Sequence, residues 1–251
     1  MPTVGVEFAK VSYTLAGGRV LLRDISLRLE AGTTTALLGR SGSGKTTLLR
    51  MINGLVRPSS GRVLVEDEDV GGADVVALRR GIGYVIQETG LFPHVRVARN
   101  VGMALELAGR RKDMGRYVER VGEVMGLVGL DGDEYGERYP WQLSGGQRQR
   151  VGLARGLALD PGVLLMDEPF GALDPITRAE MQTMLRDLLE RVGKTVVLVT
   201  HDLDEALYLA SRIIFLSDGS VAADLPPEEI VGSNNPYVKD YVSAVHRVVP
   251  T

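Results

Sequence analysis

A glycine-rich segment, Gly39–Thr46, constrains the fold of this chain more than any other feature. Its residues Gly-Arg-Ser-Gly-Ser-Gly-Lys-Thr fit the pattern G-x-x-x-x-G-K-[S/T] without a gap. An apolar run typical of a buried strand, Thr33–Leu38, precedes the segment, and a helical pattern over Thr46–Asn53 follows it. The segment alone could be an ordinary Gly/Ser-rich turn, but a strand before it and a helix after it favour a phosphate-binding loop.

Each residue type in this segment has a chemical reason to be there. Glycines at 39, 42 and 44 allow backbone angles that a Cβ would forbid, so several N–H groups can converge on an anion. The N-terminus of the following helix adds its dipole and its unpaired amides. Lys45 supplies a positive charge for the outer phosphates, and the Thr46 hydroxyl is a suitable ligand for Mg²⁺. We therefore expect a nucleotide triphosphate as ligand.

Composition narrows the function classes. The chain has 251 residues, 44% hydrophobic and 24% charged, as in ordinary globular proteins. Its formal net charge of −3 gives no electrostatic case for nucleic-acid binding, and the lack of cysteine excludes thiolate chemistry and disulfides. We see no signal-peptide pattern and no apolar stretch near the ~18 residues that cross a bilayer. Any role at a membrane is therefore expected to run through a partner.

The order of strand and helix patterns predicts an α/β protein: a P-loop NTPase core with a mainly parallel sheet, an N-terminal antiparallel β subdomain and an inserted helical subdomain. Strand patterns vanish between about Val95 and Tyr139, where amphipathic patterns predict helices at Ala104–Ala108 and Tyr117–Val128. We expect one domain, 1–251, in three parts. These are a catalytic core with the β subdomain (1–94 and 159–225), a helical subdomain (95–158) and a C-terminal extension (226–251).

Two consecutive carboxylates follow a buried strand. The apolar run Val163–Met166 ends in Asp167 and Glu168. Side chains alternate along a strand, so these two acids project differently at the ligand-binding edge of an open sheet. We assign Asp167 to Mg²⁺ and Glu168 to polarising an attacking water, the arrangement needed to hydrolyse a phosphoanhydride. The alternative is an acidic turn after a core strand. It is less favoured here because the same chain also contains a phosphate-loop motif.

A second anion-binding helix start is predicted at Leu143–Gln147, with sequence Leu-Ser-Gly-Gly-Gln. Ser144 is a plausible N-cap, and Gly145 and Gly146 expose amides at the start of a helical run. The loop Gly39–Thr46 is sufficient to bind the phosphates of one nucleotide. A second phosphate-binding segment in the same chain therefore suggests that the nucleotide lies between two copies of the chain. The alternative is a simple capping loop.

Taken together, these motifs resemble those of the ATP-binding cassette family, the nucleotide-hydrolysing subunits of membrane transporters. The motifs of that family occur here in its order: Gly39–Thr46, Gln87, Leu143–Gln147, Val163–Glu168, Ala172-Leu173-Asp174 and His201. The resemblance implies ATP and Mg²⁺ as cofactors and a head-to-tail dimer with a second copy of the chain. It also implies integral membrane permease subunits, an extracytoplasmic substrate-binding protein as an indirect partner, and a place on the cytoplasmic face of the membrane.

The resemblance also implies roles for individual residues. The catalytic residues are Glu168, His201 at the γ-phosphate, and Gln87 near the lytic water. The metal ligands are Thr46, Gln87 and Asp167. The nucleotide is bound by Tyr13, which stacks on adenine, and by Gly39, Arg40, Ser41, Gly42, Ser43, Gly44, Lys45, Thr46, Thr47, Ser144, Gly145, Gly146, Gln147 and Asp174. Without the resemblance, Tyr13 could be a core residue, Gln87 and His201 polar strand ends, and Asp174 a helix cap.

The segment Asp167–Pro175 is typical of importer-type cassettes. Ile82–Gln87 with Gly90–His94, and also Pro175–Arg178, resemble the importer group for quaternary amines such as glycine betaine, choline, carnitine and proline. The chain departs from the pattern at Glu88-Thr89 and in the basic stretch Val95–Asn100, and it ends before the pair of regulatory domains that many such cassettes carry. The alternatives are a cassette of another small-molecule importer, an exporter, or a soluble cassette acting on ribosomes or DNA.

The segment after Gln87 is expected to dock the permease. Phe92, Pro93 and His94 lie between the glutamine and the helical insert, where closure could be passed to a membrane subunit. The alternative is a surface loop with a buried phenylalanine.

Overall fold

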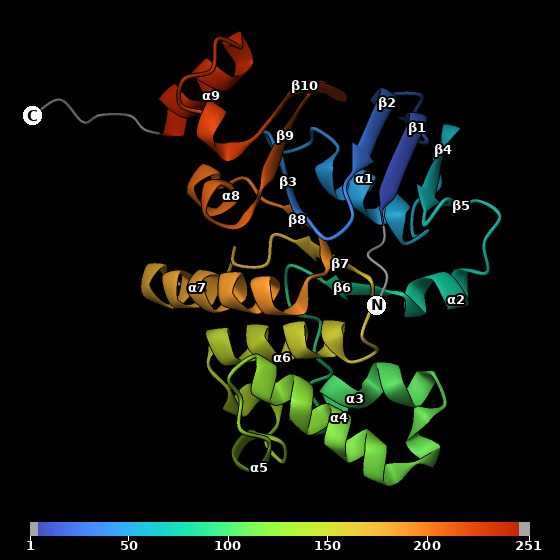
Figure 1. Ribbon diagram of the computed structural model, residues 1–251, viewed down its shortest axis with the longest axis vertical. Coiled ribbons are helices and arrows are strands. Elements are labelled where there is room, and N and C mark those ends of the chain that lie inside the picture. Colours follow the sequence, from blue (N-terminus) through green and yellow to red (C-terminus); the bar gives the residue numbers. More distant parts are fainter. Residues whose placement is uncertain (1–4, 246–251) are drawn as a thin grey trace, which may run out of the picture. The chain divides into compact units, whose positions relative to one another are not determined.

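The computed structural model describes residues 5–245 (Figure 1). By their contacts these residues divide into two compact units. One, here called the phosphate-loop unit, comprises residues 5–73 and 195–245; the other, the insert unit, comprises Asp74–Lys194. The subdomain borders expected from the sequence remain a prediction. Within residues 5–245, no helix combines the length and the apolarity that crossing a bilayer requires.

An antiparallel sheet forms the N-terminal part of the phosphate-loop unit, as expected (Figure 1). β1 (Val6–Thr14) runs as one strand, and its pairing with β2 (Val20–Leu29) shifts register after Phe8, after Val11 and after Tyr13. In β2 the buried residues Ile25, Leu27 and Leu29 alternate with exposed ones, so one face of this strand packs in the core. The strand order is β2 (Val20–Leu29), β1 (Val6–Thr14), β4 (Ser60–Val65) and β5 (Glu68–Asp69).

A second group of strands carries the phosphate loop. β3 (Thr34–Leu38) pairs in parallel with β8 (Thr195–Val199) on one side and with β9 (Arg212–Ser217) on the other. All five residues of β8 are buried, which explains its unbroken apolar run. β10 (Ser220–Leu225), which was not predicted, returns antiparallel to β9.

Helices cover these strands. α1 (Lys45–Ile52) follows β3, α8 (Leu203–Leu209) follows β8, and α9 (Pro236–Val245) comes after β10 and the 3₁₀ turn Pro227–Glu229. Leu203 and Val238, fully buried, bring α8 and α9 into one core with residues of β3 and β9. The C-terminal segment therefore belongs to the packed body of this unit.

The insert unit holds two parallel strands and six helices within its described residues. β6 (Ile82–Val85) pairs with β7 (Val163–Asp167), and α3, α4 and α6 pack on one another. Val101, Val124 and Val151, one from each of these three helices, are fully buried. The helices are α2 (Val75–Arg80), α3 (Val97–Leu107), α4 (Met114–Leu127), α5 (Gly132–Tyr135), α6 (Gly145–Leu157) and α7 (Pro175–Val192), with 3₁₀ turns at Arg110–Lys112 and Pro140–Gln142.

Several helices start earlier than their apolar periodicity suggested. The amphipathic pattern predicted a helix at Ala104–Ala108, but α3 begins at Val97. The expected helix at Arg148–Ala158 begins at Gly145, because Ser144 caps it. Helix α2, which was not predicted, buries none of its residues.

Candidate active site

The phosphate loop connects β3 to α1, and its conformation depends on its glycines. Gly39, Gly42 and Gly44 have φ angles of 150°, 79° and 101°. A Cβ at Gly39 would lie 2.3 Å from the Leu216 carbonyl oxygen, and one at Gly44 would lie 2.5 Å from Leu22 Cδ2. Only glycine meets both conditions, positive φ and close approach. The loop is thus folded into the nest expected of a phosphate cradle.

Lys45 is buried and points back along the loop that precedes it. Its Nζ donates to the carbonyl oxygens of Gly39 at 2.7 Å and Arg40 at 3.0 Å. These bonds hold the ammonium group against the loop, and the residue as a whole is only 6% exposed. A buried ammonium group beside a glycine-rich loop is suited to an anionic ligand, because opposite charges attract strongly where water is excluded.

The N-terminus of α1 is open. Gly44 is its N-cap, and no described side chain caps the helix. The amides of this first turn and the positive end of the helix dipole are the groups that favour an anion at a helix start. Thr46 and Thr47 lie in this first turn and are half-buried.

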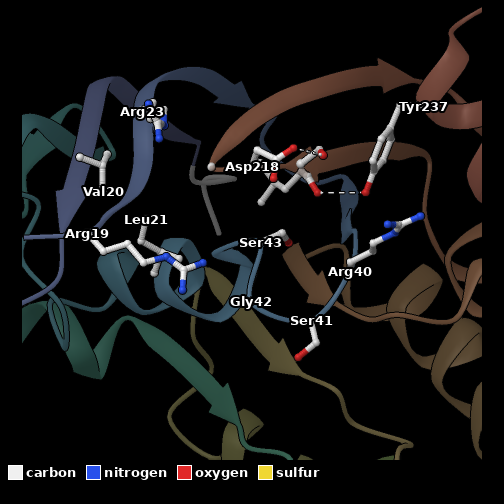
Figure 2. A pocket seen from close by; sticks show the side chains of 13 residues that line it. Arg19, Val20, Leu21, Arg23, Arg40, Ser41, Gly42, Ser43, Asp218 and Tyr237 are labelled. Atoms are coloured by element: carbon white, nitrogen blue, oxygen red, sulfur yellow. Dashed lines mark hydrogen bonds between the residues drawn. The ribbon is translucent and has the colours of Figure 1, made fainter. Parts of the chain in front are cut away.

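A pocket of about 560 Å³ opens beside the loop (Figure 2). Three arginines, Arg19, Arg23 and Arg40, and one carboxylate, Asp218, give it a positive balance. This balance favours anionic ligands. The remaining lining residues are Val20, Leu21, Ser41, Gly42, Ser43, Leu216, Ser217, Gly219 and Tyr237.

The pocket includes residues that the motif analysis missed. Arg19 and Arg23 come from β2 and the turn before it, Asp218 from the β9–β10 turn and Tyr237 from α9. These two arginines lie outside the phosphate loop in the sequence. Their charge pattern would have indicated an anion site only if the strand pairing had been known. Tyr13, expected to stack on adenine, is half-buried on β1 opposite Leu22 and is not among these lining residues.

His201 is exposed immediately after β8. Its carbonyl oxygen accepts a hydrogen bond of 2.8 Å from the Tyr241 hydroxyl on α9. The histidine therefore lies at a strand end whose backbone is held by the C-terminal helix.

In the insert unit, three predicted residues lie together at the ends of β6 and β7. Asp167 ends β7, is 5% exposed and accepts a 3.4 Å hydrogen bond from the Tyr84 hydroxyl on β6. Gln87 Nε2 donates to Glu168 Oε2 at 3.3 Å. The two carboxylates thus have different surroundings, as the alternation of side chains predicts.

The register of the two strands explains this meeting. Val85 pairs with Met166 in parallel register, so two further residues bring Gln87 level with Glu168. Glu168 itself has φ of 48°, a left-handed conformation that is uncommon outside glycine. Such conformations concentrate at functional sites, where the surrounding structure holds them.

The Leu-Ser-Gly-Gly-Gln segment forms the start of α6. The Gln147 amide donates to Ser144 Oγ at 3.2 Å, and the Ser144 amide donates to Gln147 Oε1 at 2.9 Å, a reciprocal capping box. A Cβ at Gly146 would lie 2.7 Å from Thr177 Cγ2, so this glycine also permits close packing of α6 on α7. The capping role is thus present, and Ser144 remains exposed at the helix end.

Asp174 caps α7. Its carboxylate accepts from the amides of Ile176 at 3.2 Å and Thr177 at 3.1 Å. The hydrogen bonds from Thr177 lower the pKa of this exposed carboxyl group, so it is ionised at neutral pH. The residue can cap the helix and still present charge to a partner.

The predicted docking loop is exposed but well anchored. Phe92 is 50% exposed, which argues against the alternative of a buried phenylalanine. Asn100, fully buried, accepts from the Phe92 amide at 2.8 Å and donates to the carbonyls of Phe92, Val95 and Arg96. This asparagine was missed from the sequence, because nothing in the local pattern distinguishes it from a surface polar residue.

A family model described as ABC transporter matches residues 22–171. The chain belongs to the ABC transporter family. This result confirms the family resemblance drawn from the motifs.

Individual relatives refine the comparison. The carnitine transport ATP-binding protein OpuCA of Listeria monocytogenes is 42% identical over 238 residues, covering 94% of this chain and 59% of the relative. The sulfate/thiosulfate import ATP-binding protein CysA of Xylella fastidiosa is 47% identical over 233 residues, covering 90% and 65%. The chain thus spans less than two thirds of the length of these relatives. The predicted likeness to the quaternary-amine group is confirmed by the first.

Solved structures confirm the fold class. The ATP-binding cassette MJ0796, in a dimeric post-hydrolysis state bound to ADP and Pi, matches with a TM-score of 0.78 and 33% identity. The match covers 88% of this chain and 98% of that one. The mixed parallel and antiparallel strands with an inserted helical region are therefore those of a P-loop cassette ATPase.

Proposed function

We propose that this chain binds and hydrolyses ATP as the nucleotide-binding subunit of an ABC importer for a quaternary-amine osmoprotectant. The observation that carries the catalytic part is the contact between Gln87 and Glu168 at adjoining strand ends. It places an amide and a carboxylate where one water could be oriented by both, in a chain that also has a glycine-rich phosphate loop before α1.

The proposed reaction is attack of water on the γ-phosphorus of ATP. The bond from water oxygen to phosphorus forms while the bond to the ADP oxygen breaks, and phosphate leaves. Glu168 orients the water and takes up its proton, the His201 side chain contacts the γ-phosphate, and Lys45 neutralises charge on the outer phosphates. Positioning and charge stabilisation account for most of such catalysis.

Mg²⁺ fits the donor set that the family implies. A threonine hydroxyl, a glutamine amide oxygen and an aspartate carboxylate are hard oxygen ligands, the type Mg²⁺ prefers. Thr46, Gln87 and Asp167 would supply them. With Nε2 of Gln87 directed at Glu168, its Oε1 is the atom suited to a cation. The ion would supply charge neutralisation on the phosphates.

A head-to-tail dimer of two copies is proposed to complete the nucleotide site. Ser144, Gly145, Gly146 and Gln147 would bind the phosphates held by the partner's loop, with Asp174 touching the partner. The exposure of Ser144 at the start of α6 and the dimeric state of MJ0796 support this arrangement. Differential affinity of ATP for the closed dimer would then drive closure.

Permease subunits are the proposed partners at Phe92, Pro93 and His94. The exposure of Phe92 on a loop anchored by Asn100 supports docking there, because a rigid loop transmits motion better than a free one. An extracytoplasmic binding protein would deliver the cargo, and the chain would lie at the cytoplasmic face of the membrane.

A second candidate cargo is a small inorganic anion. The sulfate/thiosulfate relative is 47% identical, so identity does not separate the two cargo classes. The resemblance of Ile82–Gln87, Gly90–His94 and Pro175–Arg178 to the quaternary-amine group favours the first.

Uptake by the complete transporter tests the proposal. The chain and its permease would be reconstituted in liposomes with ATP on the cassette side, and uptake of glycine betaine, choline, carnitine, proline and sulfate compared. We expect uptake of at least one quaternary amine and its loss with Glu168→Gln. Uptake of sulfate alone would overturn the cargo assignment, and undiminished uptake with the variant would overturn the catalytic one.

A further inference from the structure

The C-terminal helix α9 bonds to two backbone carbonyl groups of the phosphate-loop unit, one at His201 and one at Leu216 on β9. Its Tyr241 hydroxyl donates to the His201 carbonyl oxygen at 2.8 Å, across 40 residues of sequence. One helical turn earlier, the Tyr237 hydroxyl donates to the Leu216 carbonyl oxygen at 3.4 Å, the dashed bond that Tyr237 makes in Figure 2. Residues four apart lie on the same face of a helix, so one face of α9 makes both bonds.

The Leu216 carbonyl also limits which residue can stand at the first position of the phosphate loop. It is the atom that a Cβ at Gly39 would meet at 2.3 Å. Tyr237 therefore bonds to the group against which the first glycine of the loop rests. Arg40, the next residue of the loop, interacts electrostatically with Tyr241.

The two tyrosine rings are held in place by a third aromatic residue. Phe215 of β9 is fully buried and meets Tyr237 and Tyr241 edge-on, with ring centroids 6.2 and 5.5 Å apart. Such edge-to-face pairs fix ring orientation. The packing of the ring and the hydrogen bond of the hydroxyl are thus separable, since removing the hydroxyl leaves the ring contact.

The Tyr241 hydroxyl stays a donor throughout the physiological range. Burial and the nearby Tyr237 and Asp202 raise the pKa of Tyr241 to about 12, although Arg40 opposes them. A neutral phenol keeps its proton, and the carbonyl of His201 can only accept.

We propose that Tyr241 is a positioning residue for ATP hydrolysis: from α9 its hydroxyl holds the backbone of His201, and so places the imidazole for the γ-phosphate. The inference rests on the proposed function, in which the His201 side chain contacts that phosphate. It gives the C-terminal helix a part in catalysis through the backbone of His201.

Tyr241→Phe is the test, because it deletes one hydroxyl and keeps the ring. Tyr117→Phe is its matched control in the insert unit. The Tyr117 hydroxyl donates to Glu106 at 3.1 Å. Burial, the largest single effect, and the neighbouring Glu106 raise the pKa of Tyr117 to about 12. Both variants lose one hydrogen bond of a half-buried tyrosine, and only one bond involves a loop of the phosphate-loop unit.

Steady-state hydrolysis of MgATP by the full chain is measured with the affinity for a non-hydrolysable ATP analogue. We expect Tyr241→Phe to lower kcat by about 3- to 10-fold, the range for loss of one positioning hydrogen bond, with analogue affinity within about twofold of the wild type. Tyr117→Phe should leave kcat unchanged. Unchanged kcat in Tyr241→Phe, or an equal loss in both variants, would overturn the inference.

A spectroscopic readout separates positioning from general loosening. The chain has 3 histidines, so imidazole NMR signals can be assigned by substitution. With the analogue bound, Tyr241→Phe should shift or broaden the His201 signal and leave that of His94 unchanged. An unchanged His201 signal would contradict the inference.

The outcomes keep the two proposals apart. If Glu168→Gln abolishes hydrolysis while Tyr241→Phe has no effect, the proposed function stands and the positioning role fails. If wild-type protein does not hydrolyse ATP, or Glu168→Gln hydrolyses it normally, the proposed function itself fails.

Discussion

Gln87 Nε2 lies 3.3 Å from Glu168 Oε2, at the ends of two parallel strands. The contact joins residues 81 apart in sequence. It ties the carboxylate proposed to activate water to a side chain at the start of the docking loop, so a movement of that loop can reach the catalytic carboxylate through one hydrogen bond.

Glu168→Gln should abolish hydrolysis and leave ATP bound. The substitution keeps the shape of the side chain but removes the group that takes a proton, an effect of about 100-fold or more on turnover. Phosphate release and nucleotide titration measure the two quantities. Glu88→Gln removes a nearby exposed carboxylate and should change neither. Native turnover by the first variant would reject Glu168 as the base.

Gly39→Ala should destabilise the chain and prevent nucleotide binding. The new Cβ would meet the Leu216 carbonyl oxygen at 2.3 Å and sit at a φ of 150°, for a combined cost of about 2–4 kcal/mol. Denaturant unfolding and ATP titration measure it.

Gly42→Ala separates the two causes. Gly42 also has positive φ, 79°, but nothing lies within 4 Å of a Cβ there, so only the backbone cost of about 1–2 kcal/mol is expected. If both substitutions cost the same, steric contact with Leu216 does not shape the loop.

Asn100→Ala should loosen the docking loop. The side chain makes four hydrogen bonds to the backbone of Phe92, Val95 and Arg96 from a fully buried position, and its loss should cost about 2–4 kcal/mol. Urea unfolding and hydrogen exchange of the Phe92 amide measure the effect. Asn234→Ala, at an exposed asparagine, is the control. Slow exchange at Phe92 in the variant would show that other contacts hold the loop.

The pair of Asp160 and Lys194 should give an acid-dependent contribution to stability. Burial favours a higher pKa for Asp160, but the 2.7 Å hydrogen bond and charge of Lys194 outweigh it and lower the pKa. The stabilisation is therefore present above the unfolded pKa of about 3.9 and disappears as pH falls through the lower folded value.

Lys194→Met tests this dependence. The free energy of unfolding should fall at pH 7 by no more than about 1 kcal/mol, because the pair is partly exposed, and the difference from wild type should vanish in acid. Lys112→Met, at an exposed lysine, should show no such convergence. A difference that stays constant down to acid pH would rule out the charge pair as its cause.

The local parts of the site could be predicted from the sequence. The conformation of Gly39–Thr46 follows from the φ angles that its glycines allow. Ser144 and Asp174 indicate the starts of two helices because their side chains cap them. The apolar runs around β7 and β8 predicted buried strands because strands covered on both faces need apolar side chains throughout. Helix bounds were less accurate, since α3 begins seven residues before its predicted start at Ala104.

By itself, the sequence determined the family motifs and the elements that carry them, because backbone preferences and caps act over a few neighbouring residues. Only the tertiary structure decided that Tyr241 meets His201, that Asn100 is buried under the docking loop and that Arg19 lines a pocket with Arg40. These contacts join residues whose local sequence gives no sign of each other. They form because packing of the core brings their elements together, and the free energy of that packing depends on the whole fold.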